Sequence, residues 1–158
     1  KSIDLNIIGT SNLVKYCSLN KIKFIYFSTN YVYPGLKGNY DEKSSLLPYN
    51  NYAWSKLGGE TSVQLYKNSL ILRVCMTEKP FVHKEAFTNV KTSFAYHQDV
   101  ASTLFKILDK KGVLNIVFFK HRFLIIKTLF ANEAQLSLAT ILIFFCKIIF
   151  PESSFDVT

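Results

Sequence analysis

The stretch from residue 24 to residue 56 constrains the fold of this chain more than any other. It begins with an apolar, aromatic and β-branched run, FIYF (24–27), which predicts a buried strand. Ser28 and Thr29 follow, then a polar loop with Gly and Pro, and a helix is predicted to begin near residue 50. On that helix Tyr52 and Lys56 lie one turn apart and share a face. The sequence therefore predicts that a strand-end hydroxyl faces a phenol and an ammonium.

These three groups, Thr29, Tyr52 and Lys56, predict acid–base chemistry at a carbonyl group. A phenol with its ordinary pKa of about 10 exchanges protons poorly at neutral pH. A nearby ammonium favours the phenolate, so we expect Lys56 to lower the pKa of Tyr52. Thr29 can hydrogen-bond the same substrate oxygen. Together they can protonate a carbonyl oxygen while hydride reaches its carbon, or catalyse the reverse.

The rest of the pattern predicts an α/β fold with a parallel sheet. The run SLILRV (69–74) predicts a second buried strand, a late helix is predicted from a cap at Asp99 to about Lys110, and residues 113–117 predict another strand. Strand, helix and strand in this order give parallel strands joined by crossovers. Ligands of such sheets bind at the carboxyl ends of the strands, where Ser28 and Thr29 are expected.

Two helices carry further expectations. The first is predicted to end at Asn20 and to share one apolar face among residues at roughly helical spacing: Ile3, Leu5, Ile7, Ile8, Val14, Tyr16 and Leu19. The helix with Tyr52 contains Gly58 and Gly59, which cost roughly 1 kcal/mol each in a helix interior relative to Ala. The glycine pair therefore predicts close packing of that helix against a neighbour.

Composition excludes several classes of protein. The 158 residues are enough for one domain with a real core. The net charge of +8 comes from scattered lysines with only two arginines, which argues against a nucleic-acid surface. The three cysteines are widely spaced, show no metal or disulfide pattern and fit a reducing compartment. With no secretory signal at the start, the sequence predicts a cytoplasmic protein without a metal site.

The segments STNYVYPG (28–35) and YNNYAWSKLGGE (49–60) resemble the extended short-chain dehydrogenase/reductase family, which contains sugar-nucleotide epimerases, dehydratases and reductases. The pattern is most similar to that of the dTDP-4-dehydrorhamnose reductases. The resemblance covers roughly the first two thirds of the chain. It implies half of a Rossmann-like doubly wound sheet, NAD or NADP as cofactor and a nucleotide-sugar substrate. Because members often form dimers through the helix after the catalytic Tyr, it also implies a homodimer.

The resemblance also implies roles for individual residues. Thr29, Tyr52 and Lys56 would be catalytic. The cofactor would be bound by Ser28, Tyr52, Lys56 and Arg73, and the substrate by Thr29, Asn30 and His83.

Asn30 and Tyr31 narrow the reaction. The related 4,6-dehydratases carry Asp and Glu at these places, as the acid and base that eliminate water. Neither residue here has a carboxyl group, so elimination is disfavoured. Reduction of a 4-keto-deoxysugar nucleotide needs only hydride and one proton donor and is the function predicted. Epimerisation of a sugar nucleotide stays open.

Two parts of the sequence depart from the family. No glycine-rich Gly-x-x-Gly-x-x-Gly turn for a pyrophosphate occurs, so we expect a fragment of a longer enzyme, one piece of a split gene, a truncated gene model or a non-catalytic relative. We predict a catalytic half at 1–117 and an atypical apolar segment at 118–158. The longest uncharged run of that segment (134–146) is shorter than the roughly twenty residues of a membrane span, which favours a buried or interfacial helix, or a shifted reading frame.

Overall fold

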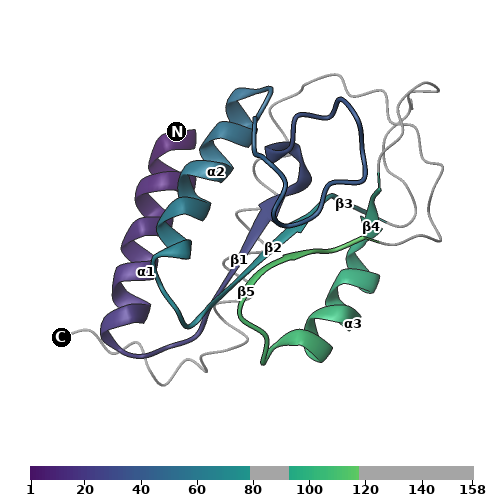
Figure 1. Ribbon diagram of the computed structural model, residues 1–158. Helices are drawn as coiled ribbons and strands as arrows, with labels where there is room; N and C mark the ends of the chain where they lie inside the picture. The colour runs from purple at the N-terminus through teal and green to yellow at the C-terminus, as the bar shows by residue number, and fades with distance from the viewer. Residues whose placement is uncertain (79–92, 118–158) are drawn as a thin grey trace. The chain divides into compact units, whose positions relative to one another are not determined.

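The computed structural model describes residues 1–78 and 93–117, which all belong to one compact unit. A three-stranded parallel sheet forms its centre, with the strand order β1-β2-β5 (Figure 1). The short strands β3 and β4 form a separate two-stranded parallel sheet. The strands are β1 (Phe24–Thr29), β2 (Ser69–Val74), β3 (Met76–Thr77), β4 (Ala95–Tyr96) and β5 (Gly112–Asn115). The predicted α/β class with a parallel sheet is confirmed.

Helices precede or link these strands. They are the π-helix η1 (Ile3–Gly9), α1 (Thr10–Leu19), the 3-10 turn η2 (Asn30–Val32), α2 (Asn51–Gln64) and α3 (His97–Ile107). Helices α1 and α2 lie side by side in Figure 1, and α2 packs against β1 and β2. The predicted end of the first helix is confirmed, because Asn20 is the C-cap of α1. The predicted start of the helix with Tyr52 is confirmed too, because Asn50 is the N-cap of α2 and its side chain accepts a 2.8 Å hydrogen bond from the Ala53 N–H.

The late elements differ from prediction in their bounds. Helix α3 begins at His97 after an extended Tyr96, so Asp99 lies in its first turn instead of capping it. Strand β5 begins at Gly112, which has a positive φ of 86°, and ends at Asn115. Pairing with β2 sets these bounds, because the register joins Leu70 to Gly112 and Arg73 to Asn115.

The apolar face predicted for the first helix is largely wrong. Val14 is buried, but Ile3, Ile8, Tyr16 and Leu19 each expose half or more of their surface. The physical reason is the π-helical turn at residues 3–9, whose wider winding changes the register of residues expected at α-helical spacing. Thr10, Val14 and Cys17 are the residues of α1 that are buried.

The close packing predicted from the glycine pair is confirmed. A Cβ on Gly58 would lie 2.8 Å from Cδ1 of Ile7. A Cβ on Gly59 would overlap the backbone oxygen of Asn6 and lie 2.6 Å from the hydroxyl of Tyr26. Helix α2 therefore lies against η1 on one side and β1 on another.

Some predictions concern residues outside the described ranges. His83 and the apolar segment 118–158 are among them, so the predicted domain boundary and the nature of that segment stay predictions. Within residues 1–78 and 93–117, no helix is long and apolar enough to cross a membrane. The same ranges contain no cluster of three or more His, Cys, Asp or Glu residues suited to a metal ion.

Candidate active site

Thr29 ends β1 and is only 4% exposed. Its hydroxyl oxygen accepts a 3.2 Å hydrogen bond from the Tyr31 N–H and thereby caps the turn η2. The hydroxyl keeps its own proton to donate. In register, Thr29 pairs with Val74 at the end of β2, so the hydroxyl lies at the carboxyl edge of the sheet as predicted.

Tyr52 and Lys56 lie on the first two turns of α2, which packs against both β1 and η2. The phenol of Tyr52 is close enough to the thiol of Cys75 for the two to interact electrostatically, and Tyr31 interacts with both. Cys75 directly follows β2, and Tyr31 lies two residues after Thr29. These neighbours place the Tyr52 phenol at the same edge of the sheet as the Thr29 hydroxyl.

The predicted lowering of the Tyr52 pKa is wrong for this structure. Burial is the largest cause acting on the phenol and raises its pKa above the ordinary value, and the neighbouring Cys75 raises it further. Tyr52 is therefore a neutral phenol at neutral pH. Sequence reasoning missed the burial because it comes from the tertiary packing of α2.

Lys56 is a buried ammonium, with 2% of the residue exposed. Its Nζ lies 4.1 Å from the centre of the Tyr26 ring, and within the described residues no carboxylate forms an ion pair with it. Burial lowers the pKa of Lys56 to about 8, against a smaller opposing effect of Glu60. A cation that is costly to bury and lacks a carboxylate partner is available to a ligand.

Glu60, one turn beyond Lys56, is fully buried and was missed from the sequence. Its carboxylate forms an ion pair with Arg73 and accepts a 2.6 Å bond from the Ser28 hydroxyl and a 3.2 Å bond from the Gln64 amide. Arg73 Nη1 also donates to the Tyr33 hydroxyl at 2.8 Å. The i, i+4, i+8 spacing after Tyr52 was the available signal.

This network bears on two predicted cofactor residues. The side chains of Ser28 and Arg73 are both 4% or less exposed and both bind Glu60. The hydrogen bonds tie the ends of β1 and β2 to α2. Each side chain thus has a structural role, and a cofactor contact by either stays a prediction.

Asn30 follows Thr29 and holds an unsatisfied acceptor. Its Oδ1 atom is buried and, within the described residues, has no hydrogen-bond partner. Since a buried carbonyl oxygen without a donor is costly, this atom is suited to accept a hydroxyl from a bound molecule. A substrate contact by Asn30 stays a prediction.

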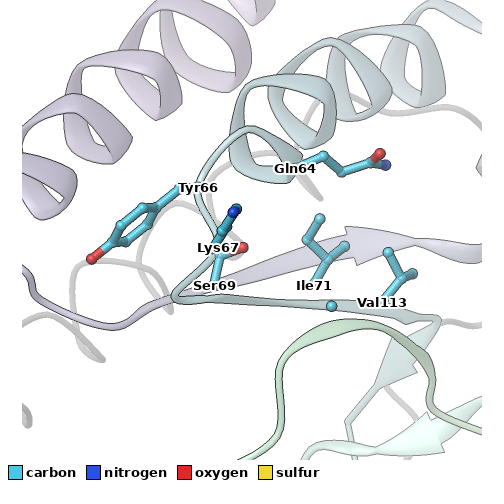
Figure 2. Close-up of a pocket in the computed structure, with 7 residues that line it drawn as sticks. Gln64, Tyr66, Lys67, Ser69, Ile71 and Val113 are labelled. Atoms are coloured by element: carbon cyan, nitrogen blue, oxygen red, sulfur yellow. The ribbon is translucent and has the colours of Figure 1, made fainter.

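A cavity of about 250 Å³ lies at the amino ends of the strands, opposite to the end that carries Thr29 (Figure 2). Its lining comes from the end of α2 and the starts of β2 and β5. Figure 2 shows the side chains of Ile71 and Val113 rising toward the helix that carries Gln64. Because ligands of parallel sheets bind at the carboxyl ends of strands, we do not assign this cavity to the reaction.

Comparison with known proteins identifies the family of this chain. The family model described as the RmlD substrate binding domain matches residues 1–117. A dTDP-D-glucose 4,6-dehydratase from Dictyostelium discoideum is 40% identical over 90 residues, covering 49% of this chain and 21% of the relative. The chain belongs to the RmlD substrate-binding-domain family.

Solved structures agree on the fold. A hypothetical dTDP-4-dehydrorhamnose reductase from Sulfolobus tokodaii is 27% identical with a TM-score of 0.62, over 71% of this chain and 46% of that one. The UDP-glucuronic acid 4-epimerase from Bacillus cereus, in complex with NAD, is 25% identical with a TM-score of 0.61, over 71% and 46%. The dTDP-4-dehydrorhamnose reductase from Bacillus anthracis, in complex with NADP, has a TM-score of 0.64 at 23% identity, over 71% and 47%. The predicted resemblance and Rossmann-like class are confirmed, and the chain spans about half the length of these structures.

Proposed function

We propose that this chain is the catalytic half of an NAD(P)-dependent reductase that acts on a 4-keto-deoxysugar nucleotide. The observation that carries the proposal is that Thr29 ends β1 while a neutral Tyr52 phenol and a buried Lys56 ammonium lie one turn apart on α2, the helix that packs against β1. Membership of the RmlD family supports the substrate class. A cytoplasmic location is part of the same proposal.

In the proposed mechanism, Tyr52 is the general acid. A neutral phenol gives its proton to the carbonyl oxygen of the substrate while the Thr29 hydroxyl donates a hydrogen bond to the same oxygen. The phenolate that remains is stabilised by the positive charge of Lys56 on the same helix face. Asn30 Oδ1 accepts a sugar hydroxyl.

The described residues fit a nicotinamide cofactor in part. The Lys56 ammonium has no carboxylate partner among the described residues and can donate to hydroxyl groups, so Lys56 and Tyr52 would hold the cofactor. Ser28 and Arg73 fit less well because Glu60 engages both. The cofactor, when bound, supplies the hydride.

The substitution Tyr52→Phe tests the proposal. In the complete protein that carries this chain, loss of the general acid is expected to reduce turnover of a dTDP-4-keto-deoxysugar about 100- to 10,000-fold. Cofactor affinity should fall much less, because Lys56 still holds the cofactor. Turnover is measured as NAD(P)H consumption and affinity by fluorescence titration. Substantial turnover in the variant would contradict the role.

Epimerisation is the second candidate, favoured by similarity to sugar-nucleotide epimerases. An epimerase recycles its cofactor, so net consumption of NAD(P)H separates the two reactions. The Asn30-Tyr31 pair continues to argue against the dehydratase reaction of the curated relative. A non-catalytic relative would show neither reaction in the complete protein.

A homodimer, as the resemblance implies, stays a proposal. Large apolar side chains on η1, α1, α2 and the residue that caps α2 are half or more exposed, including Leu5, Leu19, Trp54 and Leu65. Exposed large apolar side chains on these helices are what supports the proposal of association between copies of the chain.

A further inference from the structure

Tyr26 on β1 contacts Lys56 at both ends of that residue. The Tyr26 hydroxyl donates a 3.0 Å hydrogen bond to the backbone carbonyl of Lys56. The face of the same ring lies 4.1 Å from the Lys56 Nζ. One strand side chain thus fixes both the backbone and the charged tip of a helix residue.

Burial makes the ring contact consequential. Tyr26 is 1% exposed and Lys56 is 2% exposed, so water screens neither. An aromatic face attracts a cation electrostatically, and the attraction is greater where the pair is desolvated. Among the described residues the nearest acidic group on the same helix is Glu60, whose carboxylate already forms an ion pair with Arg73. The ring is therefore the contact that compensates the Lys56 ammonium.

The glycine at position 59 leaves the space that Tyr26 needs beside α2. A side chain there would collide with the Tyr26 hydroxyl and the backbone of Asn6. Asn6 in turn donates a 2.9 Å bond from its amide to the Ser55 hydroxyl, next to Lys56 in sequence. The approach of α2 to β1 is thus fixed from both sides of Lys56.

On the basis of the proposed function, we infer that Tyr26 is a positioning residue for Lys56, with its ring seating the ammonium and its hydroxyl fixing the helix backbone. Tyr26 is 1% exposed and so has almost no surface that a substrate could touch. It acts through Lys56, which the reaction uses to stabilise the Tyr52 phenolate.

A matched pair of substitutions separates the two contacts. Tyr26→Phe removes the hydroxyl and keeps the ring, whereas Tyr26→Leu removes the ring. The readout is the titration midpoint of Lys56, followed by NMR in protein labelled with ¹³C at lysine Cε and assigned with Lys56→Met. The charged or titratable neighbours Tyr52 and Glu60, one turn away on either side, are unchanged in both variants.

The ring contact predicts different midpoints. Tyr26→Phe should keep the midpoint near the value of about 8 in the parent. Tyr26→Leu should lower it by about one unit, since the ammonium loses the aromatic face that attracts it. Equal midpoints in the two variants would overturn the inference, because a merely structural tyrosine affects folding without selecting one protonation state of Lys56.

A second series keeps the test decisive if Tyr26→Leu does not fold. Phenylalanines with one, two and three ring fluorines at position 26 nearly preserve shape while weakening the negative ring face. The Lys56 midpoint should fall with each fluorine, and a constant midpoint would overturn the inference. The titration requires no turnover, so it stands apart from the proposed function, which fails if Tyr52→Phe stays active.

Discussion

Helix α2 buries two opposite charges one turn apart, and the two are treated differently. Glu60 is enclosed by donors from three side chains, Arg73, Ser28 and Gln64. Lys56 contacts an aromatic face and lacks a carboxylate partner in the described residues. The Glu60 carboxylate is held by several donors and joins α2 to the strands, whereas no carboxylate of the described residues pairs with the Lys56 ammonium.

The difference separates the part of the helix that stabilises the fold from the part that is suited to react. A fully bonded buried carboxylate is costly to disturb, so Glu60 and Arg73 hold α2 against the ends of β1 and β2. A partly compensated ammonium lowers stability and titrates close to neutral pH. Chemistry is therefore expected at Lys56 and rigidity at Glu60.

The largest change in stability is expected from breaking the ion pair between Glu60 and Arg73. Glu60→Gln leaves the Arg73 guanidinium buried without its counter-charge and should lower the free energy of unfolding by about 3–5 kcal/mol. Urea denaturation followed by circular dichroism measures this. The double substitution Glu60→Leu with Arg73→Met removes both charges and should recover most of the loss.

A control is provided by an exposed ion pair, in which the Lys110 Nζ lies 3.8 Å from Oδ2 of Asp109. Asp109→Asn should change stability by less than about 0.5 kcal/mol, because exposed ion pairs contribute little. If Glu60→Gln costs no more than this control, the Glu60 network does not hold α2 against the sheet.

The Lys56 end should respond in the opposite direction. Lys56→Met keeps the apolar stem and removes the buried charge, so it should raise stability at pH 7 by about 3 kcal/mol at most, judging from the pKa difference between about 8 when folded and 10.5 when unfolded. A loss of stability on Lys56→Met would contradict the comparison.

The pH dependence has a defined sign. Between pH 8 and 10 the unfolded chain binds more protons at Lys56 than the folded chain, so the Lys56 contribution makes stability rise with pH in this window. The raised pKa values of the buried phenols Tyr26 and Tyr52 act above pH 10, where they lower stability. Urea midpoints from pH 7 to 10 should therefore rise less in Lys56→Met than in the parent.

Local chemistry made much of this region predictable. The apolar run at 24–27, the Asn cap at the start of α2 and the four-residue spacing of Tyr52 and Lys56 depend on neighbours in sequence. Those signals located the strand end, the helix and the shared face. The glycine pair correctly indicated a close neighbour, although not which one.

Contacts between distant residues were not predictable in the same way. Glu60 and Arg73 are thirteen positions apart, and their pairing depends on how β2 packs under α2. The direction of the Tyr52 pKa depends on burial and on Cys75 from another strand end. The exposed side of the first helix depends on a π-helical turn that no residue spacing signalled.

The last and smallest effect sharpens the comparison at Gly59, which lies between the two charges. Gly59→Ala should cost about 1–3 kcal/mol from overpacking, because the new methyl group meets the Asn6 backbone and the Tyr26 hydroxyl. Gly58→Ala is the matched variant, since its methyl group meets side-chain atoms of Ile7 and no backbone atom. The alanine also gains about 1 kcal/mol of helix propensity. Thermal unfolding of both should show Gly59→Ala well below Gly58→Ala. Because Tyr26 must move to admit the methyl group at position 59, the Lys56 midpoint should also shift in Gly59→Ala alone, and an unchanged midpoint there would mean that the approach of α2 to β1 does not govern the Lys56 charge.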